Sequence, residues 1–501
     1  MQKKSTIDVL LTHSYHLPND SKQMKKMQPY PPLGTLYAAT ALRAAGISVA
    51  IFDSTFISPI KGFADSLEKY LPKIVVIYED DFNFVTKMCL SHMRELANQL
   101  AEAAHSKGIT VIAHGSDATD HPVEYLDNGV DYVLNGEAEQ TLIDLCSALL
   151  RSHDPSATAG LVHYAGPSKK LLREGHSPKN PSWVKLPRIA RELIDMEPYR
   201  KAWTEKHGYF STNVVSSRGC PYRCNWCAKP ISGDKFHVRE PEDVAVEIRE
   251  LRDVYGVDHI WFGDDVFALN RHWVEEFANT VESYGEVVPF KIQSRADLMS
   301  EATVLALKRA GCVEVWIGVE SGSQKILDAM DKGLRLSAIY AARERLSRSS
   351  IRACYFLQFG YPGESWYEIC DTVRLVRETR PDDIGVSLSY PLPGTAFFNR
   401  VQAQLGHKRN WIDSDDLCTI FTATYTDDFY HALRDALHAE VAEWYAPIDS
   451  PRTSGLLWSR VIEMEPVSLN PNVLPIPSKS FSDAPTTAFM PLEALVRIGG
   501  V

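Results

Sequence analysis

The sequence lacks any apolar run that approaches the roughly 18 residues of a membrane-spanning helix. Its first residues, MQKKSTIDVLL, pass directly into a short strand-like run, without the apolar core of a signal peptide. Basic residues are not in excess either, because 53 Lys and Arg against 64 Asp and Glu give a net charge of −11. This balance argues against broad electrostatic binding to nucleic acid or to anionic lipid. We therefore expect a cytoplasmic protein with no membrane span and no nucleic-acid partner.

Internal repeats of roughly 20 to 50 residues and low-complexity tracts are also lacking. With 45% hydrophobic and 23% charged residues, the composition is that of an ordinary globular protein and excludes collagen-like, coiled-coil and mostly disordered chains. The length of 501 residues predicts several domains of roughly 100 to 200 residues each. The nine cysteines are expected to be reduced, metal-bound or buried rather than paired in disulfides.

Residues 1–150 alternate between short apolar runs and helical patterns, as in a doubly wound α/β domain. The strands are predicted at 7–11, 49–52, 73–78, 109–113 and 131–134, and helical stretches include 36–45 and 85–106. Five such units predict a flavodoxin-like sheet, which binds ligands at the carboxyl ends of its strands. The crevice should be lined by residues 12–30, 53–56, 79–81, 114–117 and 135–137.

A second alternation of strands and helices occupies residues 208–400, after a segment of weak periodicity at 151–207 that we interpret as a linker. The strands are predicted at 212–217, 258–262, 289–293, 313–319, 351–357 and 383–388, and the clearest helix at 241–255. Six such units predict a barrel or partial barrel whose chemistry lies at the carboxyl ends of its strands. Residues 401–501 begin with helical patterns and end in a proline-rich tail.

Three cysteines lie in the segment SSRGCPYRCNWCAKP, directly after the first predicted strand of the second domain. Cys220, Cys224 and Cys227 have CxxxCxxC spacing, which nine cysteines in 501 residues would rarely produce by chance. A structural zinc site would need a fourth ligand, whereas the later cysteines lie singly. Soft thiolates favour an iron-sulfur cluster, in which three ligands leave one iron open for an exogenous group.

This segment resembles the cluster loop of the radical S-adenosylmethionine (radical SAM) superfamily, whose pattern is CxxxCx-aromatic-C. The likeness covers residues 208–400 and implies a partial (β/α)6 TIM-like barrel that binds a 4Fe-4S cluster and S-adenosylmethionine (SAM). Further matching segments follow the later strands: IWFGDDVF, SRADL, IGVESGS, FGYPGE and SYPLPGT. The residues that the resemblance assigns to SAM are Trp226, Asp264, Asp265, Arg295, Glu320, Ser321 and Pro391. Each alone could be a turn, cap or surface ion-pair residue, but together they follow nearly every strand at the end expected to carry chemistry.

The resemblance implies that the open iron chelates the amino and carboxylate groups of SAM. An electron delivered there would break a carbon–sulfur bond and give a 5′-deoxyadenosyl radical, which the barrel would shield from side reactions. The source of the electron is expected to be a flavodoxin- or ferredoxin-type donor.

Residues 1–150 resemble the cobalamin-binding domain that precedes such barrels in the subgroup of cobalamin-dependent methylases and the anaerobic cyclase of chlorophyll synthesis. The segments that carry the likeness are PPLGTLYAATALRAAG, IFDST and VDYVLNGEAEQTL. The residues that the resemblance assigns to cobalamin are Thr12, Leu33, Gly34, Asp53, Gly115, Ser116, Gly136 and Glu137. A plain flavodoxin-like domain that binds a flavin, or no ligand, is the alternative.

The loop after the first strand departs from the pattern of many cobalamin domains. It reads THSYHLPND and contains His13 and His16, but not the DxHxxG motif whose histidine ligates cobalt. The usual Gly-Gly pair after the fourth strand is replaced by AHGSDAT, which retains Gly115 but places His114 before it. Either histidine of the first loop could ligate the lower face of cobalt, but our hypothesis is base-off cobalamin without a histidine ligand.

These features lead to the expectation of a cobalamin-dependent radical SAM methyltransferase that acts on a small-molecule substrate, with methylcobalamin as the methyl donor. Cyclisation, oxidation or rearrangement without methyl transfer is an alternative, as is a cobalamin or iron-sulfur sensor without catalysis. No catalytic side chain is assigned. The other six cysteines are interpreted as reduced core thiols: Cys89, Cys146, Cys312, Cys354, Cys370 and Cys418.

Overall fold

The computed structural model describes residues 6–80, 82, 91–156, 158–166, 169–175, 188–229, 231–405, 417–471 and 473–476. The chain divides into two compact units. Unit 1 contains the chain up to Pro221 and the stretch from Lys229 to Ile292. Unit 2 contains the stretch from Tyr222 to Ala228 and most of the chain after Gln293. Among the described residues, no helix has the length and apolar character needed to span a bilayer.

Unit 1 begins with a sheet whose first five strands are parallel. They are β1 (Val9–Thr12), β2 (Val49–Phe52), β3 (Ile74–Tyr78), β4 (Thr110–His114) and β5 (Tyr132–Leu134). Their order is β2-β1-β3-β4-β5, which confirms the predicted flavodoxin-like topology. Every residue of β3 is buried, because helices cover both faces of a parallel sheet and leave no strand face to solvent.

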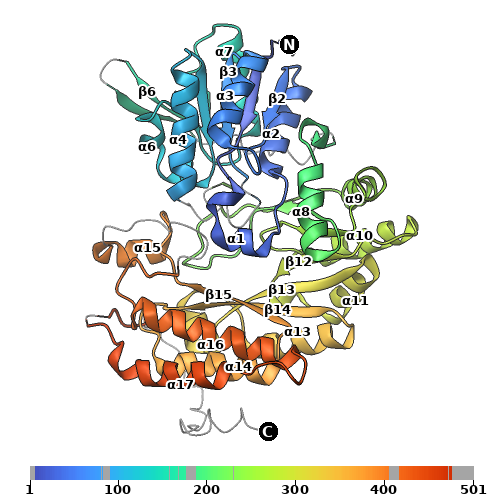
Figure 1. Ribbon diagram of the computed structural model, residues 1–501, viewed down its shortest axis with the longest axis vertical. Coiled ribbons are helices and arrows are strands. Elements are labelled where there is room, and N and C mark those ends of the chain that lie inside the picture. Colours follow the sequence, from blue (N-terminus) through green and yellow to red (C-terminus); the bar gives the residue numbers. More distant parts are fainter. Residues whose placement is uncertain are drawn as a thin grey trace. The chain divides into compact units, whose positions relative to one another are not determined.

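Two hydrophobic cores lie on the two faces of this sheet. One packs against α2 (Leu33–Ala44) and α7 (Glu139–Leu150), and the other against α3 (Pro59–Tyr70) and α4 (Ser91–His105). The blue and cyan helices of Figure 1 show this layering. The predicted helix at 85–106 corresponds to α4, and its first residues lie outside the described part of the chain.

The expected linker at 151–207 is in part a continuation of the first sheet, so that prediction was wrong there. β6 (Leu161–Ala165) pairs antiparallel with β5, and β7 (Lys170–Glu174) pairs antiparallel with β6. A further helix, α8 (Glu197–His207), follows. The sequence did not predict β7 because it is an edge strand, in which the exposed Lys170 and Arg173 interrupt the apolar pattern.

The second sheet has six strands, in the order β15-β14-β13-β12-β11-β8. They are β8 (Ser211–Val214), β11 (His259–Phe262), β12 (Phe290–Ser294), β13 (Cys312–Glu320), β14 (Arg352–Phe359) and β15 (Asp383–Leu388). The helices between them are α9 (Pro241–Tyr255), α10 (Arg271–Ser283), α11 (Glu301–Ala310), α12 (Gln324–Ala329), α13 (Leu336–Arg348) and α14 (Trp366–Thr379). This alternation confirms the predicted partial barrel.

Helix α9 illustrates how local sequence sets these elements. Proline stands in its first turn, where its missing N–H costs no helix hydrogen bond. The negative charges of Glu242 and Asp243 lie in the same turn and stabilise the helix by interacting with the positive end of its dipole. Val244, Ile248 and Leu251 are buried on one face. The helix ends at Gly256, which adopts the left-handed conformation that favours glycine.

The last part of unit 2 contains α15 (Ala396–Val401), α16 (Asp427–Tyr445) and α17 (Ser454–Met464). α16 and α17 lie side by side, as the orange and red helices of Figure 1 show. Phe429 and Tyr430 of α16 are fully buried, and the Tyr425 ring stacks on Phe429 at 4.2 Å between centroids. These aromatic side chains therefore form the core of this region. The proline-rich tail after residue 476 lies outside the described residues.

Candidate functional site

The cysteine loop begins from a two-stranded ribbon in unit 1. β9 (Ser217–Arg218) pairs antiparallel with β10 (His237–Val238), so both ends of the loop are held together. Gly219 follows β9 with φ +86°, and a Cβ atom there would lie 2.2 Å from the Lys235 carbonyl oxygen. Only glycine fits this position. The Lys229 ammonium group donates a hydrogen bond of 2.9 Å to the carbonyl of Cys220, so it links the residues just after Cys227 to the start of the loop.

Asp264 and Asp265, which follow β11, hold this ribbon. The Asp264 carboxylate accepts hydrogen bonds from the backbone N–H of Ser216 (3.1 Å) and from the hydroxyl groups of Ser216 (2.6 Å) and Ser217. The Gly219 N–H donates to the Asp265 carboxylate at 3.0 Å. Asp264 is 1% exposed, and this burial raises the pKa of its carboxyl group even though the serines act in the opposite direction. The contacts observed for both aspartates are thus with the start of the cysteine loop, and their predicted contact with SAM stays a prediction.

We expect Asp264→Asn to lower the unfolding free energy by about 1–3 kcal/mol and to reduce iron uptake, because the amide nitrogen faces N–H and O–H donors without an acceptor. Denaturant unfolding and iron analysis after anaerobic reconstitution measure the two effects. Asp258→Asn is the matched control, since Asp258 accepts the Phe210 N–H at the opposite end of β11. Equal iron uptake by the two variants would contradict a role of Asp264 in the loop.

The turn that carries Cys224 and Cys227 belongs to unit 2. The backbone N–H of Asn225 donates to the Met330 carbonyl at 2.9 Å, and its side-chain amide donates to the Ala329 carbonyl at 2.7 Å and to Asp331 at 3.0 Å. These bonds fasten the turn to the segment directly after α12. The next residue of that segment is Lys332.

Lys332 forms a buried ion pair with Glu320, whose carboxylate lies 2.8 Å from the Lys332 nitrogen. Both side chains are less than 10% exposed, at 7% and 8%. Burial opposes the charged lysine, but Glu320 and the Cys224 thiol together raise the pKa of Lys332. Glu320 has φ +62° at a register shift between β13 and β14, so its backbone is in a region that non-glycine residues rarely adopt. Opposite charges therefore lie side by side next to the cysteine turn.

Arg295 adds a second buried cation on the same side of unit 2. Its guanidinium group lies 3.7 Å from the ring centroid of Tyr222 and donates to Asp297 at 3.0 and 3.2 Å. Burial opposes its charge, but Asp297 and Cys224 are among the groups that raise the pKa of Arg295. The prediction of Arg295 as a site residue is consistent with this position. Lys332 was not predicted, because a lysine in the sequence MDKG reads as an exposed turn residue.

The remaining residues assigned to SAM have different surroundings. The Ser321 hydroxyl contacts the Thr372 hydroxyl of α14 at 3.1 Å and accepts the Ser323 N–H, so it is engaged with the helix layer. Trp226 is half-buried, and its indole N–H is buried without a hydrogen-bond acceptor among the described residues. Pro391 is buried three residues after the end of β15. An indole donor without an acceptor is a position that a bound group could satisfy.

Glu364, in the FGYPGE segment, is fully buried and accepts the Gly360 N–H at 2.6 Å. Burial raises the pKa of its carboxyl group to about 8. This residue closes the turn after β14.

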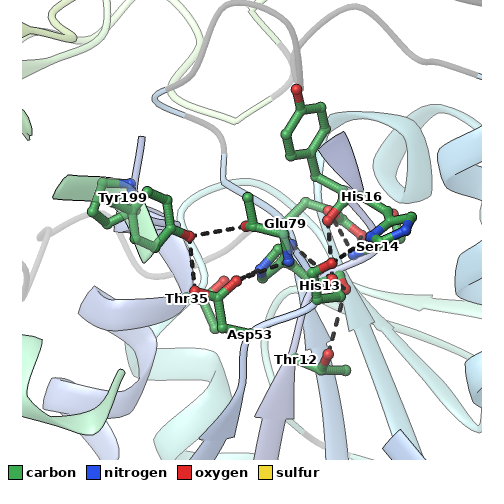
Figure 2. Close-up of polar contacts among 12 residues, drawn as sticks. Thr12, His13, Ser14, His16, Thr35, Asp53, Glu79 and Tyr199 are labelled. Carbon is green, nitrogen blue, oxygen red and sulfur yellow. Dashed lines mark hydrogen bonds and ion pairs between the residues drawn. The ribbon is translucent and has the colours of Figure 1, made fainter. Parts of the chain in front are cut away.

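The carboxyl ends of β1 and β2 carry a buried network of hydrogen bonds, shown in Figure 2. The His13 ring nitrogen Nε2 lies 3.0 Å from the Asp53 carboxylate, which also accepts the Tyr199 hydroxyl at 2.7 Å. The Tyr199 hydroxyl, from α8, lies 2.9 Å from the Thr55 hydroxyl. The second ring nitrogen, Nδ1, lies 3.3 Å from the Ser54 hydroxyl.

Both nitrogens of the His13 ring are thus engaged, and His13 is 1% exposed. A bond from His13 to a metal would require the Asp53 or the Ser54 contact to break. His16 is half-buried, and its Nδ1 contacts the Ser54 carbonyl at 2.8 Å. The hypothesis of base-off cobalamin without a histidine ligand stays a prediction.

The other residues assigned to cobalamin lie along the same carboxyl edge of the sheet. The Ser14 N–H donates to Glu79, and a Cβ atom on Gly115 would lie 2.9 Å from the Glu79 side chain, so β1, β3 and β4 meet there. The Gly34 N–H donates to Asp80 at 3.0 Å. The structure places most of these residues at or just after the ends of strands and two at the start of a helix: Thr12 is the last residue of β1, Asp53 follows β2, Gly115 and Ser116 follow β4, Gly136 and Glu137 follow β5, and Leu33 and Gly34 begin α2. The alignment of small and polar groups fits a ligand that lies across the edge of the sheet.

We expect the His13–Asp53 pair to make stability depend on pH. Burial acts against both charges, but Asp53 raises the pKa of His13 above 6.5 and His13 lowers the pKa of Asp53 below 3.8. The histidine contribution is complete below pH 6.5 and is lost as the pH rises through the raised pKa, whereas the aspartate contribution is lost as the pH falls through the lowered pKa. His13→Gln should therefore be about 1–3 kcal/mol less stable than the parent at pH 6, with a smaller difference at pH 9. A difference that stays constant across this range in denaturant unfolding would show that the pair is not charged.

The described cysteines divide by burial. Cys220, Cys224 and Cys227 are half-buried, while Cys146, Cys312, Cys354 and Cys418 are buried and Cys370 is half-buried on α14. Burial raises the pKa of the Cys146, Cys312 and Cys370 thiols to about 12, which disfavours their thiolates. Cys89 lies outside the described residues. No group of three His, Cys, Asp or Glu side chains in the described part of the chain is close enough to hold a single metal ion. The fit of the cluster therefore rests on three accessible thiols on one glycine-initiated loop.

Comparison with known sequences gives a match between residues 214–376 and the radical SAM superfamily. An uncharacterized methyltransferase of Pyrococcus horikoshii is 25% identical over 371 residues, which is 73% of this chain and 77% of the relative. An anaerobic magnesium-protoporphyrin IX monomethyl ester cyclase of Rubrivivax gelatinosus is 23% identical over 384 residues, which is 74% of this chain and 66% of that protein. The chain thus spans slightly less than two thirds of the cyclase.

Two solved structures share the fold. The radical SAM methyltransferase TsrM of Kitasatospora setae, solved with cobalamin and a 4Fe-4S cluster, superposes with a TM-score of 0.66 at 18% identity, over 80% of this chain and 75% of TsrM. The cobalamin-dependent radical SAM enzyme OxsB, solved with aqua-cobalamin and SAM, superposes with a TM-score of 0.69 at 15% identity, over 92% of this chain and 71% of OxsB. At 18% and 15% identity, this likeness shows a shared fold and nothing about the reaction.

Proposed function

We propose that this chain, whose residues 214–376 match the radical SAM superfamily, is a cobalamin-dependent radical SAM methyltransferase that acts on a small molecule. The observation that supports the proposal best is the pairing of a cysteine loop in the barrel with a flavodoxin-like domain in the same chain. Of the solved enzymes with this fold, TsrM holds cobalamin and a 4Fe-4S cluster, and OxsB holds aqua-cobalamin and SAM. We assign the cobalamin-binding domain to residues 1–150, extended by β6 and β7, and the radical SAM domain to residues 208–400.

The proposed cluster ligands are Cys220, Cys224 and Cys227. When bound, the cluster and SAM would supply a 5′-deoxyadenosyl radical, and cobalamin would carry the methyl group. The ribbon of β9 and β10 holds the two ends of the loop, and the Asn225 hydrogen bonds hold the turn between Cys224 and Cys227. This part of the chain would fix the ligands before metal arrives.

The charges beside Cys224 suit the amino acid end of SAM. A carboxylate at Glu320 can hold an ammonium group, and the cations of Lys332 and Arg295 can hold a carboxylate. The unsatisfied indole N–H of Trp226 provides another donor on the cysteine turn. We therefore add Lys332 to the proposed SAM residues Trp226, Asp264, Asp265, Arg295, Glu320, Ser321 and Pro391.

The proposed cobalamin residues are those along the carboxyl edge of the first sheet: Thr12, Leu33, Gly34, Asp53, Gly115, Ser116, Gly136 and Glu137. The buried network of His13, Asp53 and Tyr199 would keep the edge rigid and keep the histidine engaged elsewhere. The lower face of cobalt would then lack a ligand from His13. A shift of the absorption spectrum of hydroxocobalamin on binding, unchanged in His13→Gln, is the expected result.

The test of methyl transfer uses SAM with an isotope-labelled methyl group, in an anaerobic reaction with a chemical reductant, cobalamin and candidate metabolites. Label in a product supports transfer. Label confined to methionine or S-adenosylhomocysteine favours the second candidate, a cyclisation, oxidation or rearrangement, which the similarity to the cyclase of Rubrivivax gelatinosus supports. In cells we propose a flavodoxin- or ferredoxin-type protein as the electron donor, because the reaction consumes a low-potential electron.

A further inference from the structure

Arg218 is a buried arginine in β9, two residues before Cys220. It lies in the cysteine segment, but it is not among the proposed site residues. Its guanidinium group forms an ion pair of 2.8 Å with Glu139, the first residue of α7. The side chains are 8% and 2% exposed. The guanidinium also lies 4.5 Å from the ring centroid of Phe82, after β3. One side chain of the cysteine ribbon thus contacts two loops at the carboxyl edge of the first sheet.

The charges around Arg218 are unevenly distributed. Burial lowers the pKa of the Arg218 guanidinium, but the negative charges of Glu139 and Glu137 raise it. The positive charges of Arg218 and of Lys235, in the cysteine hairpin, lower the pKa of Glu137. Burial nevertheless raises the pKa of Glu137 above its usual value. Glu137 and Glu139 belong to the segment NGEAE, which also contains Gly136. Arg218 therefore contributes a buried cation to a loop that otherwise carries only acidic charges.

The backbone on either side of Arg218 is fixed to the barrel. The Ser217 hydroxyl donates to the Asp264 carboxylate and the Gly219 backbone N–H donates to the Asp265 carboxylate, so both neighbours of Arg218 are held by the residues after β11. With its backbone fixed to the barrel and its side chain fixed to α7, Arg218 has contacts in two directions. A buried ion pair adds little net stability, because desolvation offsets the attraction, but in some proteins it specifies one arrangement of the elements that it joins.

We propose that Arg218 is a positioning residue that holds the cysteine loop and the loop after β5 as one rigid body, and thereby sets the spacing between cluster and cobalamin. This inference rests on the proposed function. A fixed spacing matters because two reacting groups must be held within a narrow range of distances and orientations. Neither Arg218 nor Glu139 needs to touch the reacting atoms.

The first arm of the test needs no cofactor. Hydrogen exchange in the unloaded protein should show faster exchange of peptides covering β9 and Gly219 in Glu139→Gln, an isosteric change on the other side of the ion pair. Arg94→Gln is the matched control, because it removes a half-buried arginine of α4 whose ion pair, 2.5 Å to Asp117, lies within the first domain. If the peptides covering β9 exchange at the same rate in Glu139→Gln as in the parent, the proposal is overturned. This result does not depend on which cofactors the protein binds.

The second arm uses the protein loaded with a reduced cluster and with cobalamin in its Co(II) form, both paramagnetic. Pulsed electron paramagnetic resonance measures the distance distribution between them. We expect one narrow distance in the parent and in Arg94→Gln, a broad distribution in Arg218→Gln and Glu139→Gln, and recovery of the narrow distance in Arg218→Lys, which keeps the charge. A narrow parental distance in both Gln variants would overturn the proposal, while a parent protein that takes up neither group would overturn the proposed function itself.

Discussion

Replacing Cys224 by alanine should abolish formation of 5′-deoxyadenosine and strongly reduce iron content after anaerobic reconstitution. The reason is that the remaining two thiols of the loop cannot hold a cluster that needs three protein ligands and leaves one iron open. The fold should persist, because Cys224 is half-buried and lies in a turn that Asn225 holds by its own hydrogen bonds. Iron and sulfide analysis, product chromatography and circular dichroism measure these three properties.

Cys370→Ala is the matched control for this experiment. Cys370 is also a half-buried cysteine of unit 2, but it lies on α14 and has a thiol whose pKa is raised to about 12. We expect this variant to keep its cluster and its 5′-deoxyadenosine formation. Equal loss in both variants would mean that the loss reflects general damage, and a full cluster in Cys224→Ala would remove Cys224 from the ligand set.

Replacing Lys332 by alanine should lower the unfolding free energy by about 3–5 kcal/mol, because it leaves the Glu320 carboxylate buried without its partner. The affinity for SAM should fall as well, if the pair faces the amino acid end of the ligand. Denaturant unfolding of the protein without cofactors measures the first effect. Equilibrium dialysis with SAM on the reconstituted protein measures the second.

A double variant separates the two roles of Lys332. Lys332→Met combined with Glu320→Leu removes both charges and should recover much of the stability, since apolar residues of similar size can replace a buried ion pair. It should not recover SAM binding. A double variant that binds SAM like the parent would show that the pair has only a structural role.

The strands were predictable because buried parallel strands are short apolar runs bounded by polar loops. The predicted strand 383–388 coincides with β15, and the other barrel strands were placed within a few residues. The three cysteines of the loop were recognisable because their spacing depends only on neighbours in the sequence. Both the strands and the cysteine motif could therefore be predicted from the sequence alone.

Ion pairs between distant segments could not be predicted in this way. Arg218 and Glu139 are 79 positions apart and Lys332 and Glu320 come from a turn and a bulged strand, so nothing in the local sequence marks them as buried partners. Ser321 illustrates the same difficulty, because its motif does not reveal that the hydroxyl contacts Thr372 of α14. Which way a side chain points after a strand depends on the packing of the following helix.

The most direct test of the account is the formation of 5′-deoxyadenosine by the reconstituted protein under anaerobic conditions with SAM, cobalamin and a chemical reductant. We expect the parent protein to form 5′-deoxyadenosine and Cys224→Ala to form none. Absence of 5′-deoxyadenosine from a parent protein whose iron and sulfide content shows a full cluster would contradict it.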